Sequence, residues 1–259
     1  MRINTNVGAL NSSKNAFVNT MATESSMRKL SSGLRISRAA DDAAGLSIAN
    51  KLRAQSRSLT VASANAEQGG AMLQIAEGSA STIQRILERQ KELIIQREST
   101  GNNSSVTATL AAEINTLTDE TARIIASTNF QSSPVFNATL TFQVSDGLAG
   151  GTVTVDSNVT AADVAIVGAS ANIDRVDTAL TTINSVLARI GAGQNRLDYT
   201  VQNLKSAIVN VKAAESTIRD VDMAEEMANY TKNNILTQAA QAMLSQANQS
   251  SQSVLSLLR

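Results

Sequence analysis

"IDRVDTALTTINSVLARIGAGQNRLDYTVQNLKSAIVNVKAAESTI", residues 173–218, determines the fold class of this chain. Apolar residues recur along it at alternating intervals of three and four, and only Gln194 and Glu215 interrupt the series. A pattern of this length is typical of a coiled-coil seam. At 1.5 Å per residue, the predicted helix spans about 70 Å. The predicted seam positions are Ile173, Val176, Leu180, Ile183, Leu187, Ile190, Gln194, Leu197, Val201, Leu204, Ile208, Val211, Glu215 and Ile218.

Two other segments have the same kind of pattern, one from residue 45 to about residue 98 and one at residues 106–125. After Asn129 the period changes to two, in "LTFQVSDG" and "GTVTVDS", which predicts a β-hairpin at residues 140–157. We therefore predict a mainly α fold, an elongated antiparallel helical bundle or coiled coil with a small β-hairpin region. The predicted seam of the first segment is Leu52, Leu59, Ala66, Leu73, Ala80, Leu87 and Ile94, and the predicted face of the second is Leu110, Ile114, Leu117 and Ile124.

Both ends of the chain carry stripes of apolar side chains among few charges. Because isolated helices are marginal in water, neither end can bury its stripe alone, so the ends need each other or neighbouring chains. The N- and C-termini are therefore predicted to pair at one end of the molecule. The predicted packing residues are Ile3, Val7, Leu10 and Phe17 at the N-terminus and Leu236, Met243, Val254 and Leu257 at the C-terminus.

The composition restricts the chemistry. The absence of Cys and His excludes disulfides, Cys or His catalysis, and metal sites built on these residues. No run reaches the roughly 18 apolar residues of a membrane span, and the polar start lacks the apolar core of a signal peptide. Residues 1–60 carry nine Lys and Arg against three Asp and Glu, but without interleaved aromatic residues or a known motif. We predict no enzymatic activity, no cofactor, and no nucleic-acid or membrane partner.

"SSGLRISRAADDAAGLSIANKLR", residues 31–53, separates two predicted helices. Gly33 stands where a helix C-cap is expected, and Asp41 or Asp42 where the next helix needs an N-cap. The paired aspartates lack further metal ligands at a suitable spacing, and "AAGLS" lacks the Gly-Lys-Ser/Thr signature of a phosphate loop. The segment is therefore predicted to be a linker, whose aspartates could also pair with its arginines or with a basic side chain of an adjacent chain. The predicted site residues here are Arg35, Arg38, Asp41 and Asp42.

Three blocks of the sequence resemble bacterial flagellins. The first is "LSSGLRISRAADDAAGLSIANKLRAQ", and the last is "IRDVDMAEEMANYTKNNILTQAAQAMLSQANQSSQSVLSLLR" at the C-terminus. Between them, "GAGQNRLDYTVQNL" also matches the family. The exposed outer domains that larger flagellins insert after the hairpin are absent, and the family's "FNG" element is altered to "FQSSPVFNA".

The resemblance implies a division into shells of a filament. Residues 1–44 and 220–259 would form the two halves of an inner coiled-coil core domain, with a spoke at residues 34–45. Residues 45–171, which include the hairpin, and residues 172–219 would form the helical rod of the outer tube. The implied function is that of a structural subunit which polymerises helically into the extracellular flagellar filament used for swimming.

The resemblance also implies partners. Besides copies of itself, these are hook-associated junction and cap proteins and a flagellar export chaperone that binds the C-terminal segment. The chain would be exported unfolded through the flagellar type III secretion channel, without a cleaved signal peptide. The surface recognised by the flagellin-sensing Toll-like receptor of animals would include Arg89, Leu93 and Glu113, although the neighbouring Gln90 and Lys91 depart from the family pattern.

The sequence allows three alternatives to a flagellin: a hook–filament junction protein, a secreted enzyme mounted on flagellin ends, and a cytosolic coiled-coil adaptor. The first would be expected to lack the full "KNNILTQAAQAML" block. The second requires an inserted domain that carries ligands, for which this chain has no room.

Overall fold

The structure is a computed structural model that describes residues 6–99, 103–136, 138–145, 147, 151–166 and 172–257; for residues 251, 252 and 254–257 it describes the backbone only. The mainly α class predicted from the sequence is confirmed. The elements are α1 (Val7–Ser32), α2 (Ala43–Arg97), α3 (Ser104–Ser127), β1 (Asn129–Phe130), β2 (Ser133–Pro134), β3 (Thr139–Gln143), β4 (Thr152–Asp156), α4 (Ile173–Arg219) and α5 (Met223–Leu257).

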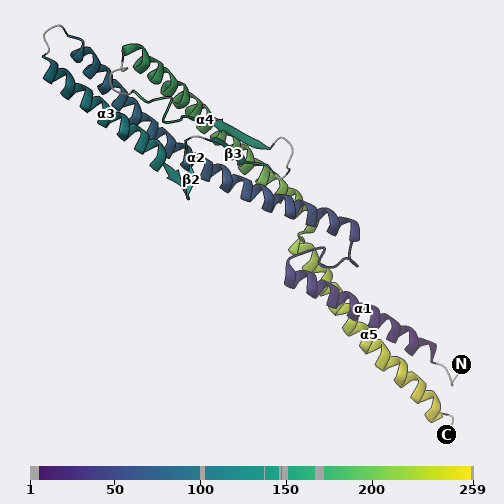
Figure 1. The fold of residues 1–259 in the computed structure, drawn as a ribbon. Coiled ribbons are helices and arrows are strands. Elements are labelled where there is room, and N and C mark those ends of the chain that lie inside the picture. The colour runs from purple at the N-terminus through teal and green to yellow at the C-terminus, as the bar shows by residue number, and fades with distance from the viewer. Residues whose placement is uncertain are drawn as a thin grey trace. The chain divides into compact units, whose positions relative to one another are not determined.

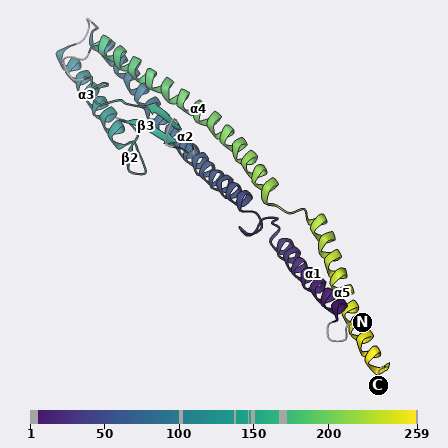
Figure 2. The same ribbon diagram turned by 90° about the vertical axis from the view of Figure 1, so that its right-hand side faces the viewer.

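The chain forms two compact units. Residues 1–54 and 211–259 make up the first, which we call unit 1, and residues 55–210 make up unit 2. Helices α2 and α4 each contribute residues to both units. Unit 1 contains α1 and α5, which run side by side in Figure 1. Unit 2 contains α3, the strands and most of α2 and α4, and Figure 2 shows its three helices running alongside one another.

The core of unit 2 forms along α2. The series predicted there at intervals of seven residues is confirmed from Leu59 to Ile94, where every member is buried, whereas its first member, Leu52, is only half-buried. Helix α4 lies antiparallel to α2, as two surface ion pairs between them record: Lys91 with Asp177 at 2.6 Å and Lys205 with Glu67 at 3.0 Å. Aliphatic side chains from a single chain therefore form the hydrophobic core of unit 2.

Only five of the fourteen seam positions predicted on α4 are buried. Val176, Ile183, Ile190, Leu197 and Leu204 are buried as predicted, but the intervening positions Leu180, Leu187 and Gln194 are only half-buried. The residues one position earlier take their places in the core: Ala179, Val186 and Gly193. The prediction for these three intervening positions is therefore wrong by one residue, because α4 packs against the hairpin as well as against α2.

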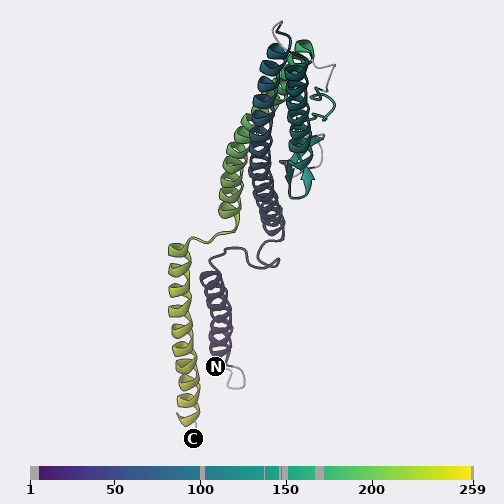
Figure 3. The same cartoon turned by 60° about the vertical axis from the view of Figure 1, so that its left-hand side comes forward.

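The β3–β4 hairpin confirms the predicted β-hairpin. Its register pairs Leu140 with Val155 and Phe142 with Val153, and the two valines are buried while the alternating threonines of β4 are exposed. Figure 3 shows the strands beside the helices of unit 2. Two glycines make this packing close. A Cβ on Gly69 of α2 would lie 2.8 Å from Phe142, and one on Gly193 of α4 would lie 2.5 Å from Val155.

The face that α3 turns to the core also differs from the prediction. Leu110 and Ile114 are buried as predicted, but Leu117 and Ile124 are half-buried, and Thr118, Thr121 and Ile125 are buried instead. The reason is a buried polar contact. The amide nitrogen of Gln90 donates to Thr118 Oγ1 at 3.0 Å and to the carbonyl of Ile114 at 3.2 Å, which draws the threonine side of α3 onto α2.

The altered "FQSSP" segment forms the tight β1–β2 turn. Gln131 and Ser132 at its tip both have positive φ, 49° and 66°. Turns of this type favour Asn-Gly, because bulkier residues are strained in the left-handed region. The substitution thus leaves the turn in place at some cost in backbone strain.

Two neighbouring glycines of α4 provide a test of the hairpin packing. Gly191 has no heavy atom within 4 Å of a built Cβ, whereas Gly193 would meet Val155 and Leu73. In a helix interior, Gly191→Ala should stabilise the protein by about 0.5–1 kcal/mol. Gly193→Ala should be less stable than Gly191→Ala by about 1–3 kcal/mol, because the added methyl group overpacks the core. Urea unfolding of the two variants measures the difference, and equal midpoints would contradict this packing.

Candidate functional site

The pairing of α1 with α5 dominates unit 1. The two helices run antiparallel, with an ion pair at one end between Lys29 and Glu226 (3.7 Å). Near the other end, the side-chain amide of Asn6 donates to the carbonyl of Ala247 at 2.9 Å. The two terminal segments of the chain therefore pair with each other.

Most of the residues that face each other across this pair are small or polar. On each helix the less exposed positions recur at intervals of three and four, as expected for a paired helix. We call these two series the α1–α5 seam. Its members are Ala9, Ser12, Ala16, Asn19, Thr23, Ser26 and Leu30 on α1, and Glu226, Tyr230, Asn233, Thr237, Ala240, Leu244 and Ala247 on α5.

Apart from Leu30 and Leu244, the large apolar side chains of α1 and α5 lie outside the seam. Phe17 is 66% exposed, Leu10 61%, Val7 58%, Met243 61% and Leu236 42%. The sequence left open whether these residues pack against the other end of the chain or against neighbouring chains. Within the chain they do not face the partner helix, because small side chains take most of the facing positions and let the helix axes approach closely. Of the other predicted packing residues, Ile3 and the side chains of Val254 and Leu257 lie outside the described residues. Packing against neighbouring chains stays a prediction for the whole set.

The linker predicted at residues 34–45 is attached to the segment that joins α4 to α5. The Arg35 N–H donates to the carbonyl of Arg219 and its guanidinium to that of Ile218, both at 2.7 Å. The Val221 N–H donates to the carbonyl of Gly33 at 3.1 Å. Gly33 itself has a φ of 69° and closes α1 as the predicted C-cap. The segment that follows α1 and the segment between α4 and α5 are thus joined by hydrogen bonds to backbone carbonyls.

Asp41 and Asp42 cap backbone N–H groups. The Asp41 carboxylate accepts from the N–H of Ser37 at 3.1 Å and of Arg38 at 3.0 Å, and these bonds lower the pKa of Asp41. Asp42 accepts from the N–H of Gly45 at 2.9 Å, which makes it the predicted N-cap of α2. Among the described residues, neither carboxylate forms an ion pair with Arg35 or Arg38. Pairing inside the linker is therefore wrong, and the two arginine side chains serve other contacts or remain exposed.

The acidic start of α5 also caps its own helix. Asp222 accepts from the N–H of Ala224 at 2.9 Å and of Glu225 at 3.3 Å. Because the N-terminus of a helix is electropositive, carboxylates there are stabilising without any catalytic role. In the part of the chain that the structure describes, no group of three or more acidic residues could hold a metal ion.

The residues matched to the receptor surface lie where α2 and α3 meet. The Arg89 guanidinium donates to Glu92 at 2.9 Å and to Glu113 at 3.3 Å, and the bond to Glu92 is the main cause of its raised pKa. Arg89 and Glu113 are both exposed, but Leu93 is only 1% exposed. As a surface contact Leu93 is therefore a wrong prediction; its side chain belongs to the core of unit 2.

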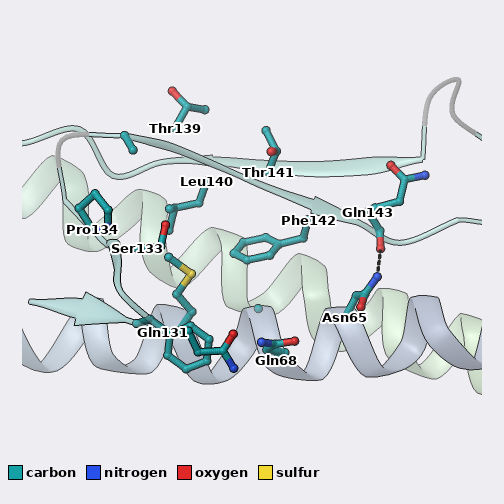
Figure 4. Close-up of a pocket in the computed structure, with 14 residues that line it drawn as sticks. Asn65, Gln68, Gln131, Ser133, Pro134, Thr139, Leu140, Thr141, Phe142 and Gln143 are labelled. Carbon is teal, nitrogen blue, oxygen red and sulfur yellow. Dashed lines mark hydrogen bonds between the residues drawn. The ribbon is translucent and has the colours of Figure 1, made fainter.

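A groove of about 490 Å³ lies between α2 and β3 in unit 2. Figure 4 shows Phe142 over the helix and the hydrogen bond from the Asn65 amide to the carbonyl of Gln143 (3.3 Å). No acidic or basic side chain lines the groove, so it offers no general acid or base. Within the described residues, no helix is long and apolar enough to cross a membrane.

Long paired helices with uncovered apolar stripes are typical of a structural subunit that associates with other chains. The comparisons with known proteins define the family. A model of the bacterial flagellin N-terminal helical region matches residues 3–141, and one of the C-terminal helical region matches residues 173–258. The chain belongs to the bacterial flagellin family.

Relatives match over their whole length. The flagellins of Bacillus subtilis (strain 168) and Halalkalibacterium halodurans are each 41% identical to this chain, with all of both sequences covered. A flagellar filament 33 kDa core protein of Treponema phagedenis is 37% identical, again over all of both sequences. The chain is therefore a structural protein of the extracellular flagellar filament that associates with copies of itself, and it is not an enzyme.

The linker caps should matter for filament assembly. Each lost cap costs about 1 kcal/mol, so replacing both aspartates by Ala should raise the critical concentration for polymerisation about tenfold or more. Unfolding of residues 55–210 should stay unchanged. Because the folded-state pKa of Asp41 is lowered, its contribution is present above the ordinary carboxyl pKa and is lost as the pH falls through the folded-state value.

The double change Asp41→Asn with Asp42→Asn is the matched control, since Asn keeps the side-chain acceptor. It should polymerise at a concentration closer to that of the unchanged chain. Sedimentation of polymer at pH 7 gives the critical concentrations. If the Ala and Asn variants behave alike, the caps have no role in assembly.

Proposed function

We propose that the apolar stripes of α1 and α5 are the surfaces through which copies of this chain bind one another in the flagellar filament. The observation that carries the proposal is the exposure of large apolar side chains on two helices that already pair. We use the term stripe for all the exposed large apolar side chains of one helix: on α1 these are Val7, Leu10, Phe17, Val18, Met21 and Met27, and on α5 they are Met223, Met227, Ile235, Leu236 and Met243.

The energy available from these surfaces is large. Burying one Leu or Phe side chain contributes about 1.5–3 kcal/mol, and each subunit exposes several. Beyond the first turn of α5 few charges oppose such burial, since residues 227–259 contain Lys232 and Arg259 as their only charged residues. The two stripes differ in sequence, so a contact between unlike stripes of successive subunits is heterologous. Heterologous contacts that do not close generate open helical polymers.

These properties support the inner position of unit 1. In this arrangement residues 1–44 and 220–259 form the inner coiled coil that lines the channel, and residues 34–45 form the spoke. Residues 45–171 and 172–219 form the outer tube. Subunits travel unfolded through the type III secretion channel, and an export chaperone covers the apolar stripe of the C-terminal segment beforehand. Junction and cap proteins of the hook-associated class bind the same terminal stripes at the two ends of the filament.

The Arg89–Glu113 pair is the accessible part of the surface that the flagellin-sensing Toll-like receptor would contact. Both side chains are engaged with each other, and Arg89 also with Glu92, so receptor binding has to compete with these bonds. The buried Leu93 supports the position of Arg89 one helical turn away.

The stripes can be separated experimentally from the seam. The double change Leu10→Gln with Phe17→Gln removes two exposed apolar side chains and leaves all seam residues in place. Helix content of the monomer should stay nearly the same. The critical concentration for polymerisation should rise by about a hundredfold or more, because two buried side chains are lost per subunit. Light scattering and electron microscopy follow the polymer.

Phe17→Leu is the matched control, and it should polymerise close to normally because it keeps an apolar side chain of similar reach. In contrast, Ala16→Leu lies in the seam and should lower the helix content of the monomer itself. Normal polymerisation of the double Gln variant would remove the stripe from the filament interface.

A further inference from the structure

The methionines of this chain are divided between the two units. Of seven in the sequence, the structure describes six. Met72 in unit 2 is buried, with 8% exposure. The five described in unit 1 are all about half exposed or more: Met21 (56%), Met27 (52%), Met223 (49%), Met227 (49%) and Met243 (61%).

None of these five belongs to the α1–α5 seam. The antiparallel register set by Lys29–Glu226 and Asn6–Ala247 distributes them along the whole length of the helix pair. Met27 and Met227 lie beside the ion pair at one end, and Met243 lies near the other. A change in their polarity therefore leaves the pairing of α1 with α5 intact and alters only the outer surface.

Exposed thioethers are the most easily oxidised groups of this chain, since it has no cysteine. Hydrogen peroxide transfers one oxygen atom to the sulfur of Met: the sulfur lone pair attacks one oxygen and the O–O bond breaks. The other oxygen leaves as hydroxide, which takes up the proton that the transferred oxygen loses and departs as water. Sulfur loses two electrons and the peroxide gains them. The product, methionine sulfoxide, is polar and a strong hydrogen-bond acceptor, and it disrupts Met-rich interfaces.

We propose that the five exposed methionines of unit 1 form an oxidation-sensitive modification site that controls incorporation of the subunit. Peroxide converts them to sulfoxides in the unassembled subunit, and the oxidised subunit polymerises poorly because its stripes are no longer apolar. In the polymer the same sulfurs are covered by neighbouring copies and react slowly. This inference rests on the proposed function, since it requires the stripes to be the contact surface.

The test treats monomer and preformed polymer with hydrogen peroxide and maps sulfoxides by peptide mass spectrometry. The five methionines should oxidise in the monomer and be protected at least about tenfold in the polymer, as expected when an interface excludes solvent. Met72 is an internal control that should react slowly in both. Equal oxidation of the five in monomer and polymer would overturn the inference.

Polymerisation of the oxidised monomer is the second measurement. Its critical concentration should rise about tenfold or more, since an unpaired polar group is buried at several sites per subunit. Reduction by methionine sulfoxide reductases should restore the original value. A variant with all five residues changed to Leu should polymerise before and after peroxide, because Leu keeps the apolar surface and has no sulfur.

The outcomes separate this inference from the proposed function. If the untreated chain fails to polymerise, the proposed function is wrong. If it polymerises and the oxidised chain does so equally well, the proposed function stands and the inference is overturned. If the five-Leu variant loses polymerisation on peroxide treatment as the unchanged chain does, oxidation acts elsewhere, and the inference is again overturned.

Discussion

The packing of small residues between α1 and α5 is the constraint on which unit 1 depends. Ala, Ser, Thr and Asn at the facing positions let two helices pair closely, but they bury little apolar surface. The pairing therefore orders the two ends of the chain without consuming their large apolar side chains. Had Leu10 and Phe17 faced α5, unit 1 would be a closed coiled coil with a polar exterior and little reason to associate.

The linker solves a different problem, which is to turn the chain without a prolyl or disulfide constraint. Gly33 ends α1 in the left-handed conformation, and Asp42 starts α2 by accepting the Gly45 N–H. A Cβ on Gly45 would meet the capping carboxylate of Asp42 and the end of the Ile36 side chain, so a side chain here would force one of them to shift. Between the caps, Arg35 is tied to the carbonyls of residues 218 and 219. Local backbone chemistry thus fixes a segment that has almost no core of its own.

The sequence predicted the elements well but chose the wrong face on several helices. Periodicity identifies which residues are apolar, and in unit 2 this sufficed for α2, whose buried series is aliphatic throughout. On α4 and α3 the faces actually buried include Gly193, Thr118 and Thr121, which carry no hydrophobic signal. On α1 none of the described residues that were predicted to pack faces α5, and the facing residues, apart from Leu30, are Ala, Ser, Asn and Thr. The caps at Gly33 and Asp42 were predictable because they depend on neighbours a few residues away, whereas the pairing of Arg35 depends on residues 183 positions later in the sequence.

The two units consequently differ in what holds them folded. Unit 2 buries aliphatic side chains from α2, α3, α4 and the hairpin within one chain, so its stability does not depend on protein concentration. Unit 1 keeps its largest apolar residues exposed, so each contact with another copy adds stability by mass action. A chain with this division can fold unit 2 by itself, whereas unit 1 reaches its full stability only in contact with neighbouring copies. The exposed stripes have to stay apolar if they are to pack against neighbouring copies. A single oxygen atom added to a methionine sulfur makes that surface polar, so it affects assembly more than folding.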